Sequence, residues 1–446
     1  MRSREGETCI MTFTISDESI SRTVQNLLSK GFIDRDVDTA VLLYDFDFLK
    51  SRIEELRKAF PANAVHAIAV KANPLSVILE FMKTLGSGFE VASLPELELV
   101  RSLGVPASRI VFDSPAKTIP ELRLAIEYGC HVNIDSFQEL ERVDGILSHT
   151  VKRPTGTFGI RINPQVGTGS IEATSVAGEY SKFGIPLLQY EDEITQAYLN
   201  RPWLTGVHLH IGSQGCPMDM LLRGCGAVYD YVTRLNEKLD KSGCGSRINI
   251  FDIGGGLPVS YYRDRESDTL TSYAKNLSAN YPALFSNEYS TITEFGRHVS
   301  ANAGWVLSRV EYVKVSPHIR TAIIHVGADM FLRKSYRPDD WHHDVSVLDK
   351  EGRLKSGPLQ GYNLAGPLCF AGDFVAKNMS LPDIEQGDYV VIRDAGAYTL
   401  SMWSRYNSRQ MPLVLGYYKE GSQVKIVRHR EKVADVVSFW GPNGPT

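Results

Sequence analysis

The sequence lacks an excess of charge of either sign, and it lacks paired cysteines. Its 446 residues carry 48 Lys and Arg against 52 Asp and Glu, for a formal net charge of −4. This balance predicts neither a nucleic-acid partner nor attraction to an anionic membrane surface. The six cysteines form no CxxC pair and follow neither zinc-site nor disulfide spacing: Cys9, Cys130, Cys216, Cys225, Cys244 and Cys369.

Long apolar runs are also missing, because no stretch reaches the roughly 18 residues of a membrane-spanning helix. Residues 1–16 carry charges of both signs and have no apolar core followed by a small-residue cleavage site. We therefore expect no membrane partner, and the unpaired cysteines indicate a reducing compartment, the cytoplasm.

Short apolar segments with β-forming residues alternate with helical stretches such as residues 75–84 and 120–128. The apolar segments end near Asn73, Ser93, Asp113, Asp135, Asn163, Ile211, Ile253 and Glu294. Eight such units over roughly 250 residues predict a closed (β/α)8 TIM barrel. A doubly wound open sheet is the alternative, but it would gather its ligand at one switch point, whereas distinctive residues follow nearly every strand here.

After about Gly304 the pattern changes to alternating segments without helices between them. These are residues 309–315, 321–326, 389–393 and 412–427, the last interrupted like a hairpin at Glu420-Gly421. We predict an α/β protein with a barrel over residues 40–304 and a C-terminal β-sandwich or β-barrel domain over residues 305–446. Residues 1–39 are expected to pack on the β-domain.

Lys71 follows the apolar run of residues 65–70, at the end of the first predicted barrel strand. A lysine there can extend to water, which is the common case. It can also condense with a carbonyl, which is how lysine carries pyridoxal phosphate. That cofactor further needs an anion cradle for its phosphate, a partner for its pyridine nitrogen and a wall against its ring.

The phosphate cradle has candidates after the seventh and eighth strands. Gly254, Gly255 and Gly256 would let backbone N–H groups approach an anion, and Gly296-Arg297 adds a fixed positive charge. Barrels often bind phosphate with these two loops. The triple glycine is not a dinucleotide fingerprint, because it comes late in the chain and is followed by a proline.

Glu294 is the candidate for the pyridine nitrogen, although a structural ion pair with Arg297 would be the better explanation if the two residues stood alone. His208 and His210 alternate with apolar residues and share one face, so one of them could stack on the ring. Two such histidines also occur in metal sites and in ordinary cores. No third ligand stands nearby in the sequence, so we expect no metal.

Taken together, these segments resemble the alanine-racemase-fold (fold type III) pyridoxal phosphate-dependent amino acid decarboxylases, and among them the diaminopimelate and ornithine decarboxylase group. The resemblance runs in order from about residue 40 to 410. Its motifs are Val70-Lys71-Ala72-Asn73, Phe89-Glu90-Val91-Ala92-Ser93, Val132-Asn133-Ile134-Asp135-Ser136, Arg161-Ile162-Asn163-Pro164, Ser181-Lys182-Phe183-Gly184, His210-Ile211-Gly212-Ser213-Gln214, Asp252-Ile253-Gly254-Gly255-Gly256, Glu294-Phe295-Gly296-Arg297, Gly366-Pro367-Leu368-Cys369 and Gly396-Ala397-Tyr398.

The resemblance implies pyridoxal 5'-phosphate as cofactor and a head-to-tail homodimer with active sites shared at the subunit interface. Lys71 would be the Schiff-base lysine, His210 the ring-stacking histidine and Glu294 the partner of the pyridine nitrogen. The implied phosphate ligands are Ser213, Gly256, Gly296, Arg297 and Tyr398. The implied supporting residues are Glu90 and Arg161.

Cys369 resembles the cysteine that the partner subunit sends into the site to reprotonate the carbanion, although by itself it would be taken for a buried structural thiol. The candidate substrate residues are Arg333, Tyr336, Phe370 and Tyr398. Phe370 stands where the family has an acidic residue for a distal ammonium. An aromatic ring cannot form that ion pair, but it could offer a cation–π contact or pack on an apolar chain. The planar fork of Arg333 suits a substrate carboxylate.

We therefore predict a decarboxylase that converts a lysine-, ornithine- or diaminopimelate-like amino acid to an amine and carbon dioxide. The sixth motif is more similar to the diaminopimelate branch, so a D-configured centre is a candidate. Replacements for the missing distal anion could be Asp329, Asp340 or Glu420. The alternatives are diaminopimelate decarboxylase proper, a racemase, and a non-catalytic cofactor-binding protein of the same fold.

Overall fold

The computed structural model describes residues 14–149, 155–243, 245–263, 265 and 269–442, which form two nine-stranded sheets. Eight parallel strands of one sheet form a closed ring. They are β2 (Val65–Ala69), β3 (Gly88–Val91), β4 (Ile110–Asp113), β5 (His131–Ile134), β6 (Thr157–Asn163), β8 (Leu204–His208), β9 (Ile250–Asp252) and β10 (Ser290–Thr293). Because β10 pairs with β2, the barrel prediction is confirmed and the open sheet is wrong.

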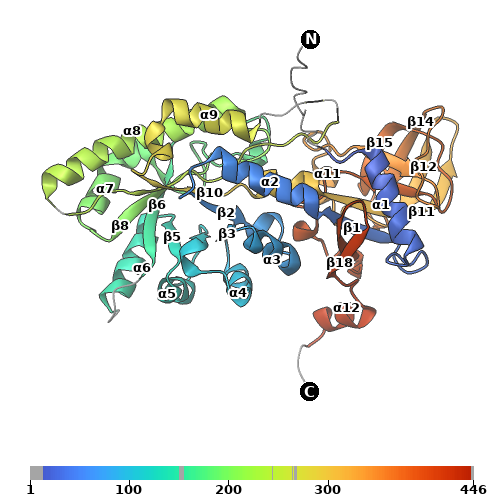
Figure 1. Cartoon of the computed structure of the whole chain (residues 1–446), viewed down its shortest axis with the longest axis horizontal. Coiled ribbons are helices and arrows are strands. Elements are labelled where there is room, and N and C mark those ends of the chain that lie inside the picture. The colour runs from blue at the N-terminus through green and yellow to red at the C-terminus, as the bar shows by residue number, and fades with distance from the viewer. Residues whose placement is uncertain (1–13, 150–154, 244, 264, 266–268, 443–446) are drawn as a thin grey trace, which may run out of the picture.

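Helices follow most of the barrel strands and cover the outside of the ring (Figure 1). They are α2 (Phe46–Ala59), α3 (Ser76–Thr84), α4 (Leu94–Ser102), α5 (Ile119–Tyr128), α6 (Phe137–Ser148), α7 (Leu187–Leu199), α8 (Met218–Ser242) and α9 (Leu270–Asn280). Ser93, Thr118 and Ser136 cap α4, α5 and α6 by accepting a hydrogen bond from a first-turn N–H. These caps start each helix soon after a strand ends. Because the strands are parallel, the side chains at their carboxyl ends lie at one rim of the barrel. The ninth strand, β7 (Ile185–Pro186), pairs with β6 outside the ring.

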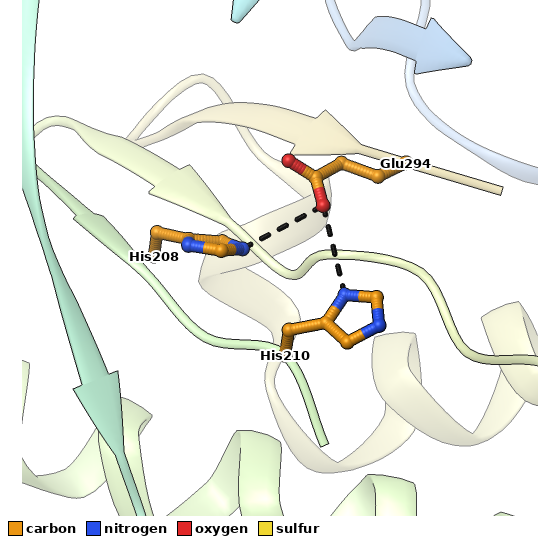
Figure 2. Close-up of side chains that lie close together, drawn as sticks. All are labelled: His208, His210 and Glu294. Carbon is orange, nitrogen blue, oxygen red and sulfur yellow. Dashed lines mark ion pairs between the residues drawn. The ribbon is translucent and has the colours of Figure 1, made fainter. Parts of the chain in front are cut away.

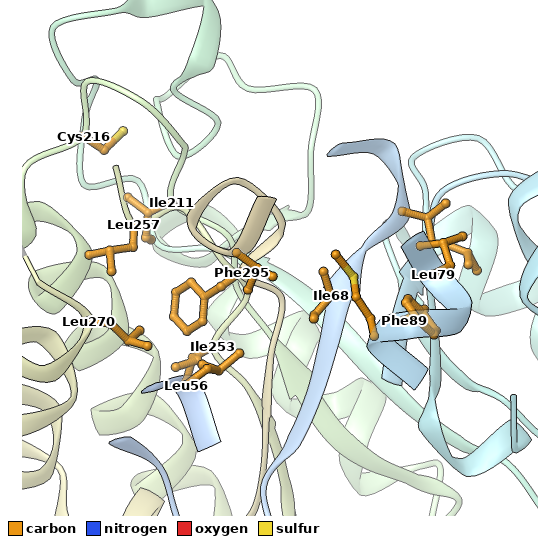
Figure 3. Packing of buried hydrophobic residues seen from close by; sticks show 14 of the residues in the cluster. Leu56, Ile68, Leu79, Phe89, Ile211, Cys216, Ile253, Leu257, Leu270 and Phe295 are labelled. Carbon is orange, nitrogen blue, oxygen red and sulfur yellow. The ribbon is translucent and has the colours of Figure 1, made fainter. Parts of the chain in front are cut away.

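The largest hydrophobic cluster fills the space between the ring and its helices and continues into the second sheet. Figure 3 shows part of it, with Ile68, Leu79 and Phe89 on one side and Phe295 near Leu270 on the other. Phe295, which directly follows Glu294, is 2% exposed. Its packing fixes the backbone that carries the Glu294 carboxylate.

The second sheet forms the predicted β-domain. Its later strands are β11 (Gly304–Val315), β12 (Arg320–Ile324), β13 (Val345–Leu348), β14 (Gln360–Ala365), β15 (Phe374–Leu381), β16 (Tyr389–Ile392), β17 (Leu413–Tyr418) and β18 (Gln423–Arg428). The hairpin between β17 and β18 turns through left-handed φ angles of 54° at Glu420 and 78° at Gly421. The remaining helices are the short α10 (Gly296–Ser300) and α11 (Leu332–Tyr336), and α12 (Val433–Trp440).

Residue 40 does not begin the barrel, contrary to our expectation. Strand β1 (Ala40–Asp45) lies in the second sheet, antiparallel to β11 and parallel to β17. Its apolar side chains are buried on both faces, and α2 follows it directly. An apolar strand followed by a helix has the same sequence pattern in a barrel, which explains the error.

Helix α1 (Asp17–Ser29) packs on the second sheet. Its residues Ile20 and Val24 share a buried cluster with Trp305 of β11, and Ser21 donates a hydrogen bond to the carbonyl of Gly352 (2.8 Å). Among the described residues, no helix is both long enough and apolar enough to cross a membrane.

Candidate active site

Lys71 lies in a short helical turn (Val70–Ala72) directly after β2. Its Nζ donates a hydrogen bond to Glu90 of β3 (2.9 Å), and its side chain remains 39% exposed. Burial opposes the ammonium charge, but the carboxylates of Glu90 and Glu294 outweigh it and raise the pKa of Lys71. Burial raises the pKa of Glu90 to about 8, although Lys71 opposes this shift. The amine is therefore oriented into the barrel rim and still reachable.

Glu294 directly follows β10 and is 3% exposed. One of its oxygens lies 3.6 Å from Nε2 of His208 and 3.6 Å from Nδ1 of His210 (Figure 2). Burial opposes the carboxylate charge, yet His208 and His210 hold the pKa of Glu294 well below its usual range. Burial likewise opposes the charge on His208, but Asp113, Asp252 and Glu294 raise its pKa to about 9.

Both Glu294 oxygens lack a hydrogen-bond donor within the described part of the chain. A buried, ionised carboxylate without a donor is costly unless a ligand supplies one. The protonated pyridine nitrogen of pyridoxal phosphate is such a donor. The alternative ion pair with Arg297 is wrong, since Arg297 donates to the hydroxyls of Ser213 (3.0 Å) and Tyr261 (2.7 Å).

Glu294 is also the third ligand that the sequence did not place beside His208 and His210. The donor atoms of the three side chains all lie within 4.8 Å of one another. However, Nδ1 of His210 already accepts a hydrogen bond from the N–H of Gly255 (3.2 Å), which favours the cofactor over a metal ion here.

The glycine loop after β9 packs closely against the neighbouring backbone. Gly254 and Gly256 have φ angles of 65° and 101°, in the left-handed region that favours glycine. A Cβ at Gly255 would lie 2.6 Å from the carbonyl oxygen of Glu294, and a Cβ at Gly256 would collide with the carbonyl of Gly212. On the adjoining loop, a Cβ at Gly296 would lie 2.9 Å from the Cβ atoms of Ala69 and Ala72. Side chains are excluded at the positions where backbone N–H groups can face a phosphate.

Two guanidinium groups border this cradle. Arg297 and Arg333 both face the rings of Trp341 and Tyr398, and Arg333 lies 3.8 Å from the Trp341 centroid. Burial, helped by the charge of Arg297, lowers the pKa of Arg333 to about 10. The N–H of Tyr398 donates to the carbonyl of Ala72 (3.0 Å), so this cluster adjoins Lys71. Sequence reasoning found Arg297, Arg333 and Tyr398 but missed Trp341, which carries no motif.

Arg161 supports the site from within the barrel. Its guanidinium bonds Asp113 (2.8 Å) and lies 3.9 Å from Asp135. Burial opposes ionisation of Asp113, but Arg161 and His208 lower its pKa. Asp252, whose pKa burial raises to about 8, accepts a hydrogen bond from Asn133 (3.0 Å). Asp113 and Asp252 were not among the predicted site residues, although their place at strand ends was a usable signal.

Cys369 lies in the loop between β14 and β15 and is exposed, so it is not a buried structural thiol. Its N–H donates to the side-chain oxygen of Asn407 (2.7 Å), and its carbonyl accepts from the hydroxyl of Tyr406 (3.1 Å). Both partners belong to the β-domain. The β-domain therefore holds the backbone of the loop that carries the thiol.

The four candidate substrate residues divide into two pairs. Arg333 lies 5.3 Å from the Tyr398 ring, whereas Phe370 stacks on Tyr336 with centroids 5.7 Å apart. Tyr336 is 66% exposed. Helix α11 carries both Arg333 and Tyr336, so it links the cofactor side of the site to the Cys369 loop.

Of the three candidate distal anions, one borders the site. Asp340 lines a cavity of about 450 Å³ together with Tyr261 and Trp341. Asp329 is buried and accepts hydrogen bonds from two N–H groups of its own loop. Glu420 pairs with Arg22 of α1 (2.6 Å), at the β17–β18 hairpin.

The site combines a barrel with a reachable lysine (Lys71), a buried carboxylate without a hydrogen-bond donor (Glu294) and an anion cradle. This combination defines a pyridoxal phosphate-dependent enzyme.

Comparison with known proteins narrows this class. The family described as "Pyridoxal-dependent decarboxylase, pyridoxal binding domain" matches residues 47–301. The chain is 34% identical to the diaminopimelate decarboxylase of Pseudomonas fluorescens over 82% of this chain and 84% of that protein. It is 30% identical to that of Aquifex aeolicus (strain VF5) over 90% and 91%. Diaminopimelate decarboxylase from M. jannaschii in co-complex with L-lysine has a TM-score of 0.80 and 27% identity, over 91% of this chain and 92% of that chain.

The chain belongs to the pyridoxal-dependent decarboxylases. It is a pyridoxal phosphate-dependent amino acid decarboxylase, a lyase. This family assignment favours decarboxylation over the racemase and binding-protein alternatives.

Proposed function

We propose that, within the class of lysine-, ornithine- and diaminopimelate-like amino acids, this decarboxylase prefers a substrate, L- or D-configured, whose far end carries a second carboxylate as in diaminopimelate. The observation that carries the proposal is Arg333, which lies on Trp341 and has no carboxylate partner among the described residues. A largely buried cation without a counter-ion favours an anionic ligand. The relatives named diaminopimelate decarboxylase support the same substrate class, since diaminopimelate has a carboxylate at each end.

In this proposal each group has a separate task. Bound pyridoxal phosphate would supply the electron sink for the bond broken at Cα. Lys71 would hold the cofactor, Glu294 would keep the ring nitrogen protonated, and His210 would lie against the ring. Ser213, the glycine loop and Arg297 would bind the phosphate. Arg333 would bind the far carboxylate.

The test is carbon dioxide release by cofactor-loaded enzyme from amino acids that differ at the far end. Diaminopimelate carries an ammonium and a carboxylate there, 2-aminopimelate only the carboxylate, and L- or D-lysine, L- or D-ornithine and arginine only a cationic group. We expect release from the two carboxylate-bearing compounds. Release from the cationic compounds alone would overturn the role of Arg333, and silence across the panel would overturn the substrate class.

Arg333→Lys is expected to raise KM for the preferred dicarboxylate roughly 10- to 100-fold, with a smaller change in kcat. A lysine keeps the charge but loses the planar fork, and a charge-assisted hydrogen bond contributes about 1.5–3 kcal/mol. Steady-state kinetics measure the split. Arg353→Lys is the control, because Arg353 is exposed and pairs with Asp349 (3.7 Å), away from the site. Equal effects of the two changes would contradict the assignment.

Phe370→Glu should raise kcat/KM for lysine relative to 2-aminopimelate by roughly tenfold, since it restores a carboxylate for a distal ammonium. Phe370→Leu separates this effect from loss of the stack on Tyr336. If the ratio of the two specificity constants moves alike in both variants, Phe370 does not face the distal end of the substrate.

We also propose a homodimer with shared active sites, in the cytoplasm. Exposed Cys369 is surrounded by exposed aromatic side chains, including Tyr336 (66%) and Tyr406 (49%), which favours cover by a second copy. The buried free thiols of Cys130, Cys216 and Cys225 fit a reducing compartment. Sedimentation of the cofactor-loaded protein tests the assembly, and a monomer at assay concentrations would contradict it.

A further inference from the structure

A single buried carboxylate, that of Asp373, joins two loops at the edge of the β-domain. One of its oxygens accepts a hydrogen bond from the N–H of Leu368 (2.6 Å), in the Cys369 loop. The other accepts from the N–H of Ala328 (2.6 Å), in the loop between β12 and α11. Asp373 is 4% exposed. Such short bonds from two chain segments to one carboxylate fix the segments relative to each other.

Two glycines close around this carboxylate. A Cβ at Gly327 or at Gly366 would collide with the Asp373 oxygens, and a Cβ at Gly366 would also lie 2.6 Å from the Cα of Gly327. The N–H of Gly366 donates to the carbonyl of Asp373 (2.9 Å). The loops can approach the carboxylate this closely only because both positions lack a side chain.

The joined loops lead to residues with proposed roles on both sides of the site. Leu368 directly precedes Cys369, whose own N–H and carbonyl are held by Asn407 and Tyr406. On the other side, the carbonyl of Gly327 accepts from the N–H of Phe331 (2.7 Å), just before α11 and Arg333. Displacement of the carboxylate would therefore move the thiol and the guanidinium relative to each other.

We propose that Asp373 is the positioning residue that holds the Cys369 loop and the start of α11 in one fixed arrangement. Asp373 acts through the backbone of its neighbours and does not itself contact the reacting atoms. The catalytic part of this inference rests on the proposed function of Cys369, whereas the positional part concerns the loop alone.

Asp373→Asn tests the inference with little change in shape. An amide has one oxygen acceptor, so its NH2 group must face one of the two backbone N–H donors, and that loop loses its anchor. The control is Asp349→Asn, away from the site. There the N–H groups of Glu351 (2.9 Å) and Arg353 (2.8 Å) both bond one oxygen of Asp349, which the amide retains, so the same change of residue type removes no anchor.

The measurements are the alkylation rate of Cys369, resolved by peptide mass spectrometry, together with kcat, amine formed per carbon dioxide released, and cofactor absorbance. For Asp373→Asn we expect the alkylation rate to change severalfold and kcat to fall roughly tenfold or more, with the cofactor absorbance retained. The amine yield should fall as well. Asp349→Asn should leave all four at their original values. Unchanged alkylation and kcat in Asp373→Asn would overturn the proposal.

A second measurement does not depend on the variant folding. In the unaltered cofactor-loaded enzyme, the amides of Leu368 and Ala328 should exchange hydrogen slowly, and fast exchange at either would overturn the proposal. The role of Asp373 in positioning the loop can be tested separately from the role of Cys369 as proton donor. If Cys369 is not the proton donor, Cys369→Ala keeps full activity, while Asp373→Asn still changes the alkylation rate.

Discussion

Lys71→Ala is expected to abolish carbon dioxide release and to remove the visible absorbance of the bound cofactor. Lys71 presents its amine at the barrel rim, 2.9 Å from Glu90. No other lysine is placed beside Glu294 in the described residues, so nothing can replace the covalent attachment. Absorbance after cofactor addition and release of carbon dioxide from the preferred substrate are the two measurements.

The control for this change is Lys83→Ala. Lys83 lies in α3, the helix that follows Lys71, and its Nζ donates to the carbonyl of Leu103 on the outside of the barrel. Its removal should cost some stability and leave the absorbance unchanged. If Lys71→Ala kept the absorbance band, the lysine that carries the cofactor would have to be sought elsewhere.

The barrel could be predicted because each strand is followed by chemically distinctive residues. Lys71, His210, Glu294 and the glycine loop each stand at the carboxyl end of a strand, and parallel strands bring those ends to one rim. The same logic failed at β1, because an apolar strand with a helix after it looks alike in either domain. Strands β13, β14 and β15 were missed, since their alternation is weak and loops separate them.

Site residues could be predicted where their role depends on the chemical nature of the side chain. They were predicted less well where the role depends on neighbours that only the folded chain brings together. Glu294 was found, but the low pKa of its carboxyl depends on His208, whose own pKa is raised, against the effect of burial, by three acidic side chains that only the fold brings together. Trp341 was missed for the same reason, because its stack on Arg333 joins separate loops. The exposure of Cys369 could not be read from its Gly-Pro-Leu context.

Cys369→Ala is expected to lower kcat by roughly 100- to 10,000-fold, the range usual for loss of a positioned proton donor, while the cofactor absorbance stays intact. The backbone of Cys369 is held by Asn407 and Tyr406 of the β-domain, so the change should leave the barrel residues that would hold the cofactor in place. The kcat of Cys369→Ser should lie between those of the unaltered enzyme and Cys369→Ala, because a hydroxyl can donate a proton but is a weaker acid than a thiol. Cys216→Ala, which removes a buried thiol, is the control.

Mixing two inactive variants then separates a shared site from a self-contained one. If Cys369 serves the barrel of a second copy, a hybrid of Lys71→Ala and Cys369→Ala contains one site with both residues intact, and activity should partly return on mixing. The exposed position of the thiol favours this outcome over action within its own chain. A mixture of the two variants that stays inactive after subunit exchange would place both residues in the site of one chain. An active Cys369→Ala would assign the proton donor to another group.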